Sequence, residues 1–223
     1  MKGDHLAIPS INLAVSVSQS PSQRILEIAP LCSTMTGAST GSFPASIHLS
    51  VDADKQVILI TFDFFHDPRV EQNTYTHDNS AMWNQEVFEV FISAGAETPM
   101  RYLEIELNPN GALFSAWVTN PDGTGSNNLL EFFAGRDAGI QTSVVKGENS
   151  WHGKIIIPLS LLGSLQEHYR LNFFRIVSLQ SHDPKSSWSC TAESCAFLAW
   201  SPTLSGNTPN FHVPACFGHL ILK

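Results

Sequence analysis

The stretch RYLEIELNPNGALFSAWV, residues 101–118, contains two segments of alternating character joined by a turn. In Arg101–Leu107 aliphatic side chains occupy every second position and acidic side chains stand between them. Side chains two positions apart share one face of a strand, so one face here is apolar. The turn Asn108-Pro109-Asn110-Gly111 leads into a second segment, Ala112–Val118. Because the proline presets the turn and Asn-Gly supplies positive φ, the stretch predicts an antiparallel hairpin.

Similar short segments, separated by Gly, Pro, Asn and Asp clusters, recur along the chain and are typical of consecutive antiparallel strands. Helical spacing is found only at Ser160–Gln166. We therefore expect an all-β fold, an antiparallel β-sandwich of jelly-roll or immunoglobulin-like type, in a single domain. Residues 1–44 are expected to form an irregular N-terminal segment packed on the sandwich, which occupies residues 45–223. The further strands predicted are Ile47–Val51, Val57–Phe65, Glu86–Ser93, Ile140–Val145, Trp151–Ile157, Leu171–Leu179 and Gly218–Leu222.

Composition excludes several classes of protein. The chain has 223 residues, is 43% hydrophobic and 14% charged, and carries a net charge of −8. Nucleic-acid binders cluster Lys and Arg to displace counterions, and the 12 basic residues here are scattered, so no nucleic-acid partner is expected. There is no apolar run of 18 residues, so no membrane span is expected either. The N-terminal residues lack a signal-peptide core, which favours a cytoplasmic location.

The four cysteines, Cys32, Cys190, Cys195 and Cys216, match no CxxC spacing. Free, partly buried thiols are the plain interpretation. The alternative is that Cys190 and Cys195 pair across a short loop in an oxidising compartment.

Charged side chains stand where apolar ones are expected on three strands. Glu89 shares its strand face with Val87 and Phe91, whereas Arg175 shares its own with Leu171 and Phe173. We expect Arg175 to reach a carboxylate on a neighbouring strand, such as Glu89 or Glu104. Such a pair can be an ion pair that closes a sheet face, a polar floor that matches the vicinal hydroxyls of a sugar, or both together.

Two tryptophans are candidate ligand contacts. Trp83 lies among polar residues directly before a strand, and Trp200 lies in the long region between the last strands. A flat indole beside hydrogen-bonding groups can hold the apolar face of a pyranose ring, although ordinary partial burial is the alternative for either residue.

Five segments, in this order, resemble the family-nine carbohydrate-binding modules and their relatives in the DOMON-like group of β-sandwiches. The resemblance runs from about residue 45 to the C-terminus. The segments are WNQEVFEVFI (83–92), YLEIELNPNGA (102–112), WHGKIIIP (151–158), NFFRI (172–176), and WSP (200–202) together with FHVP (211–214) and FG (217–218).

This resemblance implies a jelly-roll-like sandwich that binds oligo- or polysaccharide chain ends between two tryptophans over polar side chains. Trp83 corresponds to the first stacking residue, Glu89 to a hydrogen-bonding carboxylate and Trp200 to the second stacking residue. The resemblance also implies structural Ca²⁺, for which Asp63, Asp67 and Asp78 are candidate oxygen ligands, and an extracellular location. Non-catalytic carbohydrate binding is therefore the predicted function.

Three alternatives remain open from the sequence. A carbohydrate-active enzyme could use Glu89 and Glu104 as paired carboxylates, but no nucleophile-and-base signature accompanies them. A haem b-binding electron-transfer domain would need an axial pair, for which Met82 or Met100 with His182 or His212 are the candidates. A protein-interaction module would have Trp83 and Trp200 packed inside.

Overall fold

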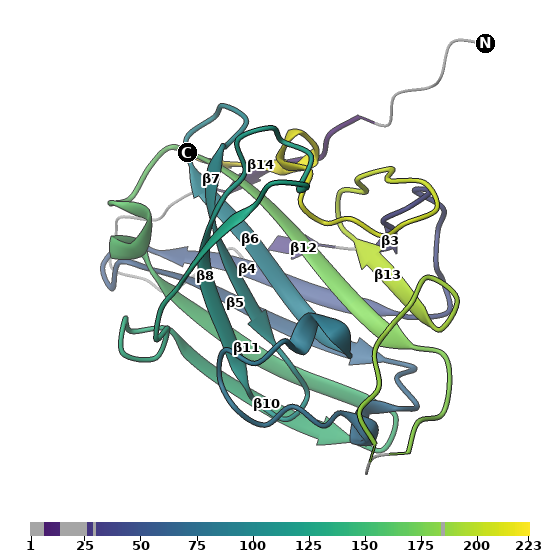
Figure 1. The fold of residues 1–223 in the computed structure, drawn as a ribbon. Coiled ribbons are helices and arrows are strands. Elements are labelled where there is room, and N and C mark those ends of the chain that lie inside the picture. The colour runs from purple at the N-terminus through teal and green to yellow at the C-terminus, as the bar shows by residue number, and fades with distance from the viewer. Residues whose placement is uncertain (1–6, 14–25, 29, 184–185) are drawn as a thin grey trace, which may run out of the picture.

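The structure is a computed structural model that describes residues 7–13, 26–28, 30–183 and 186–223. Two sheets stack as the layers of a sandwich (Figure 1). Neighbouring strands are antiparallel except for β1 and β14, which run parallel. No helix in these residues is both long enough and apolar enough to span a bilayer.

The larger sheet has the order β1-β14-β12-β6-β7-β8-β9, with β13 paired to β12 and to β3. Its strands are β1 (Ser10–Leu13), β3 (Cys32–Ser33), β6 (Val87–Ala94), β7 (Arg101–Leu107), β8 (Leu113–Thr119), β9 (Leu129–Phe132), β12 (His168–Ser178), β13 (Cys195–Ala199) and β14 (Gly218–Leu222).

The smaller sheet has the order β10-β11-β5-β4-β2. Its strands are β2 (Leu26–Ile28), β4 (Ala45–Asp52), β5 (Val57–Phe65), β10 (Gln141–Gly147) and β11 (Ser150–Pro158). The short 3-10 helices are η1 (Val70–Gln72), η2 (Met82–Asn84), η3 (Leu159–Leu162) and η4 (Pro214–Cys216).

The main core lies between the sheets, because alternate side chains of each strand point inward. Its centre is aromatic: the ring of Phe62 lies 4.7 Å from that of Phe88 and 5.0 Å from that of Trp151. Full burial of one such side chain contributes about 1.5–3 kcal/mol to the free energy of unfolding. This layer supplies the rigid support for the opposite face of the larger sheet.

That opposite, outer face of the larger sheet is also covered. Phe91, Tyr102, Phe114 and Phe174 point outward from β6, β7, β8 and β12 into a second buried cluster. Loop residues such as Phe211 pack onto it. The larger sheet is therefore buried on both faces over its middle strands, and the outer face is where a site between sheet and loops can form.

The sequence-based fold prediction is confirmed as an all-β sandwich, and β5 and β7 have the predicted bounds. Residues 1–6, 14–25 and 29 of the segment expected to be irregular lie outside the described residues; in the described part of residues 1–44, β1, β2 and β3 pair with the two sheets. Strands β9 and β13 were also not predicted. The helical spacing at Ser160–Gln166 corresponds only to the single turn η3.

Candidate functional site

A pocket of about 370 Å³ lies on the outer face of the larger sheet. This volume is within the range of small-molecule sites, roughly 300–1,000 Å³. Five side chains from β6, β7, β8, β12 and β13 form its floor: Glu89, Glu104, Phe114, Ile176 and Phe197. Its walls come from loops and from β9, and include Trp83, Asn128, Leu130, Asn210, Phe211 and His212.

Trp83 stands at the edge of this pocket in η2. The preceding residue, Met82, is 0% exposed and belongs to the outer-face cluster, whereas Trp83 is 40% exposed. Its indole meets the ring of Phe114 edge to face, with centroids 5.3 Å apart. The indole is therefore supported by the sheet through Phe114 and still exposes a large apolar surface at the pocket.

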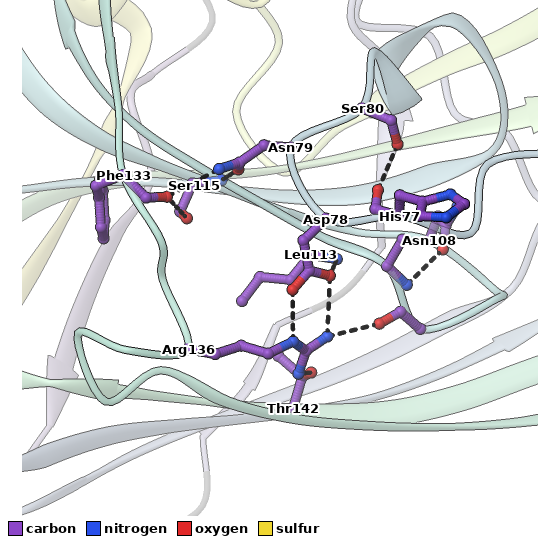
Figure 2. Close-up of polar contacts among 12 residues, drawn as sticks. His77, Asp78, Asn79, Ser80, Asn108, Leu113, Ser115, Phe133, Arg136 and Thr142 are labelled. Carbon is purple, nitrogen blue, oxygen red and sulfur yellow. Dashed lines mark hydrogen bonds and ion pairs between the residues drawn. The ribbon is translucent and has the colours of Figure 1, made fainter.

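The loop that leads to Trp83 is fixed to the edge of β8 (Figure 2). Asp78 Oδ1 accepts the backbone N–H of Leu113 at 2.8 Å, and Asn79 Oδ1 accepts that of Ser115 at 3.0 Å. Arg136 donates to Asp78 Oδ2 through Nε at 2.7 Å. These side chains accept backbone N–H groups at the edge of β8 that have no partner strand there, and they hold the loop in place. The position of Trp83 is thus set before a ligand binds.

Three carboxylates lie close together at the floor. Glu89 on β6 is directly opposite Glu106 on β7, and Glu104 lies two residues along the same face. Oxygen atoms of all three lie within 4.8 Å of one another. Glu89 is 2%, Glu104 4% and Glu106 0% exposed. Burial raises the pKa of Glu104 to about 7, and burial together with the neighbouring acidic charges raises the pKa of Glu89 and Glu106 well above the usual range.

His212 forms the wall opposite the polar floor. Its ring stacks on Phe91 at 5.1 Å, and its Nδ1 lies 2.7 Å from the Tyr102 hydroxyl oxygen. Burial lowers the pKa of His212 to about 4, so its ring is neutral at pH 7 and Nδ1 can accept the Tyr102 O–H. The loop with Gly125 closes against this residue, because Asn120 Nδ2 donates to the His212 carbonyl at 3.0 Å.

The model of carbohydrate-binding family 9 matches residues 36–222. The chain belongs to carbohydrate-binding family 9. This family 9 chain is 30% identical over 157 residues to a protein of Arthroderma benhamiae named "Extracellular protein", a match that covers 64% of the chain and 63% of the relative. The chain thus spans less than two thirds of the length of that curated relative. The expectation of a cytoplasmic location finds no support in this relative, whose name refers to the outside of the cell.

Solved structures share the fold. A candidate carbohydrate-binding protein from Bacteroides uniformis superposes with a TM-score of 0.61 at 18% identity, covering 97% of this chain and 98% of that one. A family 9 module from Caldicellulosiruptor kristjanssonii in complex with glucose gives a TM-score of 0.54 at 16% identity, covering 96% and 95% of the two chains. The same kind of module in complex with cellotriose gives 0.51 at 14% identity, covering 96% and 93%.

Of the five predicted ligand contacts of the family 9 chain, the fold brings Trp83, Glu89 and Glu104 to one pocket. The exposed Trp83 differs from the packed residue that the interaction-module hypothesis predicts.

Arg175 lies on the other side of the sheet from these carboxylates, so the predicted contact with Glu89 or Glu104 was wrong. Strand β12 pairs Arg175 with Phe88, whose side chain points between the sheets. The guanidinium is 0% exposed, lies 4.4 Å from the centre of the Phe64 ring and bonds to Asp67. The charge is thus an internal ion pair, the structural alternative of the sequence analysis.

Trp200 also lies outside the pocket. Its ring packs against Phe173 on the inner face of β12, with centroids 6.0 Å apart, and a Cβ at Gly218 would collide with it. The expected role of Trp200 as second stacking residue does not fit this position. Phe197 and Phe211 are the aromatic residues from the C-terminal part of the chain that line the pocket instead.

The three aspartates predicted as metal ligands do not assemble. Asp63 points away from the core of the smaller sheet, opposite His152 on β11. Asp67 accepts from Trp151 Nε1 at 2.9 Å as well as from Arg175. Asp78 forms an ion pair with Arg136. Among the described residues, the acidic group close enough to hold a cation is the carboxylate cluster of Glu89, Glu104 and Glu106.

The residues considered for haem ligation have other surroundings. Met82 is buried, whereas Met100 is 67% exposed. The ring of His182 stacks on Trp188 at 3.9 Å, and its Nε2 is hydrogen-bonded to Ser178 Oγ. Nδ1 of His212 is hydrogen-bonded to the Tyr102 hydroxyl.

Cys190 and Cys195 form a disulfide, so free thiols were the wrong interpretation for this pair. Cys32 and Cys216 are free. The disulfide matters for the pocket because the backbone N–H of Cys190 donates to the carbonyl of Asn84, next to Trp83, at 2.7 Å. The long loop after β12 thereby supports the segment that carries the exposed indole.

Several residues in the pocket or directly beside it were not found from the sequence. Glu106 follows the same alternation as Glu104 and could have been included on that signal. Leu130, Asn210 and Phe211 have no local pattern that marks them, since they reach the pocket only through the folding of loops. His212 was considered for haem alone.

Proposed function

We propose that this family 9 chain is a non-catalytic module that binds a terminal sugar residue in the pocket. Trp83 stacks on the apolar face of the ring, and Glu89 and Glu104 accept hydrogen bonds from its hydroxyls. The observation that carries this proposal is the combination of a 40% exposed indole at the rim with two nearly buried carboxylates on the floor of the same pocket.

A pyranose ring has the same two-sided character as this pocket. Its C–H face suits Trp83, and the apolar side chains of Ile176 and Phe211 exclude water around it. Its equatorial hydroxyls suit the carboxyl groups of the floor, and a typical hydrogen bond of this kind contributes about 0.5–1.5 kcal/mol net. Modest affinity is expected, because every such bond replaces one to water.

Glucose and β-linked glucose oligomers are the first ligands to test. Family 9 modules of the same fold have been solved in complex with glucose and with cellotriose. The floor of the pocket is closed by the sheet, which favours the end of a saccharide chain over an internal unit.

An extracellular location is the corresponding proposal for where the module works. The curated relative is named as extracellular, and the disulfide between Cys190 and Cys195 is a bond that persists in oxidising compartments. Secretion of the native protein from its source cells, tested by detecting it in the culture medium and in the cell lysate, checks this proposal. Protein found only in the lysate, with reduced cysteines, would contradict it.

The binding test is calorimetric titration with glucose and cellotriose, followed by a glycan array if neither binds. Trp83→Ala is expected to reduce affinity at least tenfold while leaving the melting temperature within about 2 °C of wild type. Phe65→Ala is the matched control, because Phe65 is also an exposed aromatic residue, at 46%, but lies on β5 of the smaller sheet. Equal loss in both variants, or a folded wild type that binds no glycan on the array, would overturn the proposal.

A further inference from the structure

The carboxylate cluster at the pocket floor is more acidic than saccharide binding requires. Glu89 and Glu104 line the pocket, but Glu106 does not, and it is 0% exposed. Glu106 is therefore not among the residues that a sugar in the pocket would contact. Yet Glu106 is directly opposite Glu89 in the β6–β7 ladder, the arrangement in which like charges destabilise a sheet.

Positive side chains do not offset this charge. Arg101, on the same strand as Glu104, pairs with Glu131, and Arg175 pairs with Asp67 on the far face. In the described ranges, no Lys or Arg forms an ion pair with the three carboxylates of the cluster.

Four of the six oxygen atoms of the cluster have no donor from another residue, although a proton shared between Glu104 and Glu106 would link those two groups. Both Oε1 and Oε2 of Glu106 are buried and unpartnered, and so are Oε1 of Glu89 and Oε2 of Glu104. A buried carboxylate oxygen without a partner costs about 1–3 kcal/mol or more, and native proteins rarely leave four such atoms together. A saccharide in the pocket can satisfy the oxygens of Glu89 and Glu104, which line it, but the two oxygens of Glu106 lie outside the pocket lining and need another partner.

We propose that Glu89, Glu104 and Glu106 bind one Ca²⁺ ion at the floor of the pocket. Their oxygen atoms lie within 4.8 Å of one another, close enough for one ion to contact all three residues. A purely carboxylate donor set selects a hard cation. Ca²⁺ accepts irregular geometry and two oxygens from one carboxylate, whereas Mg²⁺ requires a near-ideal octahedron and retains several waters, for which this buried site offers little room.

The cation site shares Glu89 and Glu104 with the saccharide proposal but can be tested apart from it, since Glu106 contributes to the ion alone. A bound ion would also explain how the three buried carboxyl groups stay deprotonated. Burial raises the pKa of all three carboxyl groups, and a divalent ion supplies the opposite charge that favours the deprotonated forms. The competing explanation is that the cluster holds shared protons and no metal.

The test starts from full-length protein treated with EDTA and then dialysed against metal-free buffer. Calorimetric titration with CaCl₂ is expected to show one site per chain. Thermal unfolding with Ca²⁺ at a hundredfold excess over the dissociation constant is expected at a temperature about 5–10 °C higher than in EDTA. No heat of binding together with identical unfolding temperatures would overturn the proposal and leave shared protons as the explanation.

The matched variants are Glu106→Gln and Glu167→Gln. Glu167 has a 73% exposed side chain outside the cluster, so its substitution should leave calcium binding unchanged. Glu106→Gln should weaken calcium binding at least tenfold and remove most of the calcium-dependent thermal shift. A folded Glu106→Gln protein that binds Ca²⁺ like wild type would also refute the site. If that variant does not fold, the wild-type titration decides alone.

Discussion

Arg175 and Asp67 are joined by an ion pair with an Nη2–Oδ2 distance of 3.2 Å in the closed space between the two sheets, where both side chains are 0% exposed. Removing one partner leaves the other as an uncompensated buried charge. Arg175→Met is therefore expected to lower the free energy of unfolding by about 3–5 kcal/mol, measured by urea denaturation. Because Arg175 lies on the inner face, folded Arg175→Met protein should bind saccharide as wild type does.

The double variant Arg175→Met/Asp67→Leu separates lost pairing from lost packing. It removes both charges at once, so it is expected to be more stable than Arg175→Met alone. The same urea experiment provides the comparison. Equal stability of Arg175→Met and wild type would show that Asp67 does not need this partner.

The disulfide between Cys190 and Cys195 closes a short loop, with a sequence separation of 5. Loop-closure entropy assigns such a bond about 2 kcal/mol, and Cys190→Ser/Cys195→Ser should lose no more than that in urea denaturation. Because the Cys190 N–H supports the Asn84 carbonyl beside Trp83, we also expect saccharide affinity to fall severalfold. Cys32→Ser serves as the control for thiol loss. Unchanged affinity in the double variant would show that the segment with Trp83 holds its position without this support.

Gly125 lies where two loops meet at the pocket wall. It has φ of +81°, and an added Cβ would lie 2.7 Å from Cβ of His212. Gly123 has φ of +68° and nothing within 4 Å of its added Cβ, so it provides the matched control. Gly123→Ala should cost about 1–2 kcal/mol from backbone strain alone, and Gly125→Ala should cost more and also weaken saccharide binding. Equal effects in thermal unfolding and calorimetry would mean that the loops move apart without penalty.

The buried imidazole of His212 gives stability a definite pH dependence. Its pKa in the folded state is about 4, below the value of about 6.5 expected in the unfolded chain. The unfolded state therefore binds the extra proton first as pH falls. The stabilising contribution of neutral His212 is complete above about pH 6.5 and is lost between about pH 6.5 and pH 4, amounting to about 3 kcal/mol.

His212→Gln isolates this effect, since glutamine keeps an acceptor for Tyr102 but does not titrate. Buried carboxylates with raised pKa values change stability in the opposite direction over the same range, so the difference between wild type and variant is the quantity to measure. Urea denaturation at pH 7 and pH 4.5 should show a smaller loss on acidification for His212→Gln. The same loss in both proteins would contradict the assignment.

Local pattern was sufficient for part of this molecule. The β7–β8 hairpin was predictable because its alternation and its Asn-Pro-Asn-Gly turn are both local. For the same reason, Glu89 was correctly placed among apolar neighbours, and Glu104 was correctly placed on the face of its strand opposite the aliphatic side chains. The error at Arg175 shows the limit: alternation assigns a face within one strand, but it does not say which face of the next strand is on the same side. That depends on the pairing of Arg175 with Phe88, which the sequence does not contain.

The pocket walls were beyond sequence reasoning for a related reason. Phe211 and His212 approach Glu104 only because loops distant in sequence fold over one sheet face, and loops carry no period from which contacts can be derived. Trp200 illustrates the consequence. Its neighbours in sequence resemble the family pattern, but its side chain turns to Phe173 and the inner core.

The parallel pairing of β1 with β14 has a mechanical consequence. Ser10 is opposite His219 and Leu13 is opposite Leu222, so the two strands run side by side in the same direction. Tension applied between the N-terminal end of β1 and the C-terminal end of β14 pulls the strands past each other along their length. The hydrogen bonds between the two strands are then loaded in shear and resist together, instead of breaking one at a time from one end. A module pulled between these two ends of the fold is therefore expected to yield late at the β1–β14 pair.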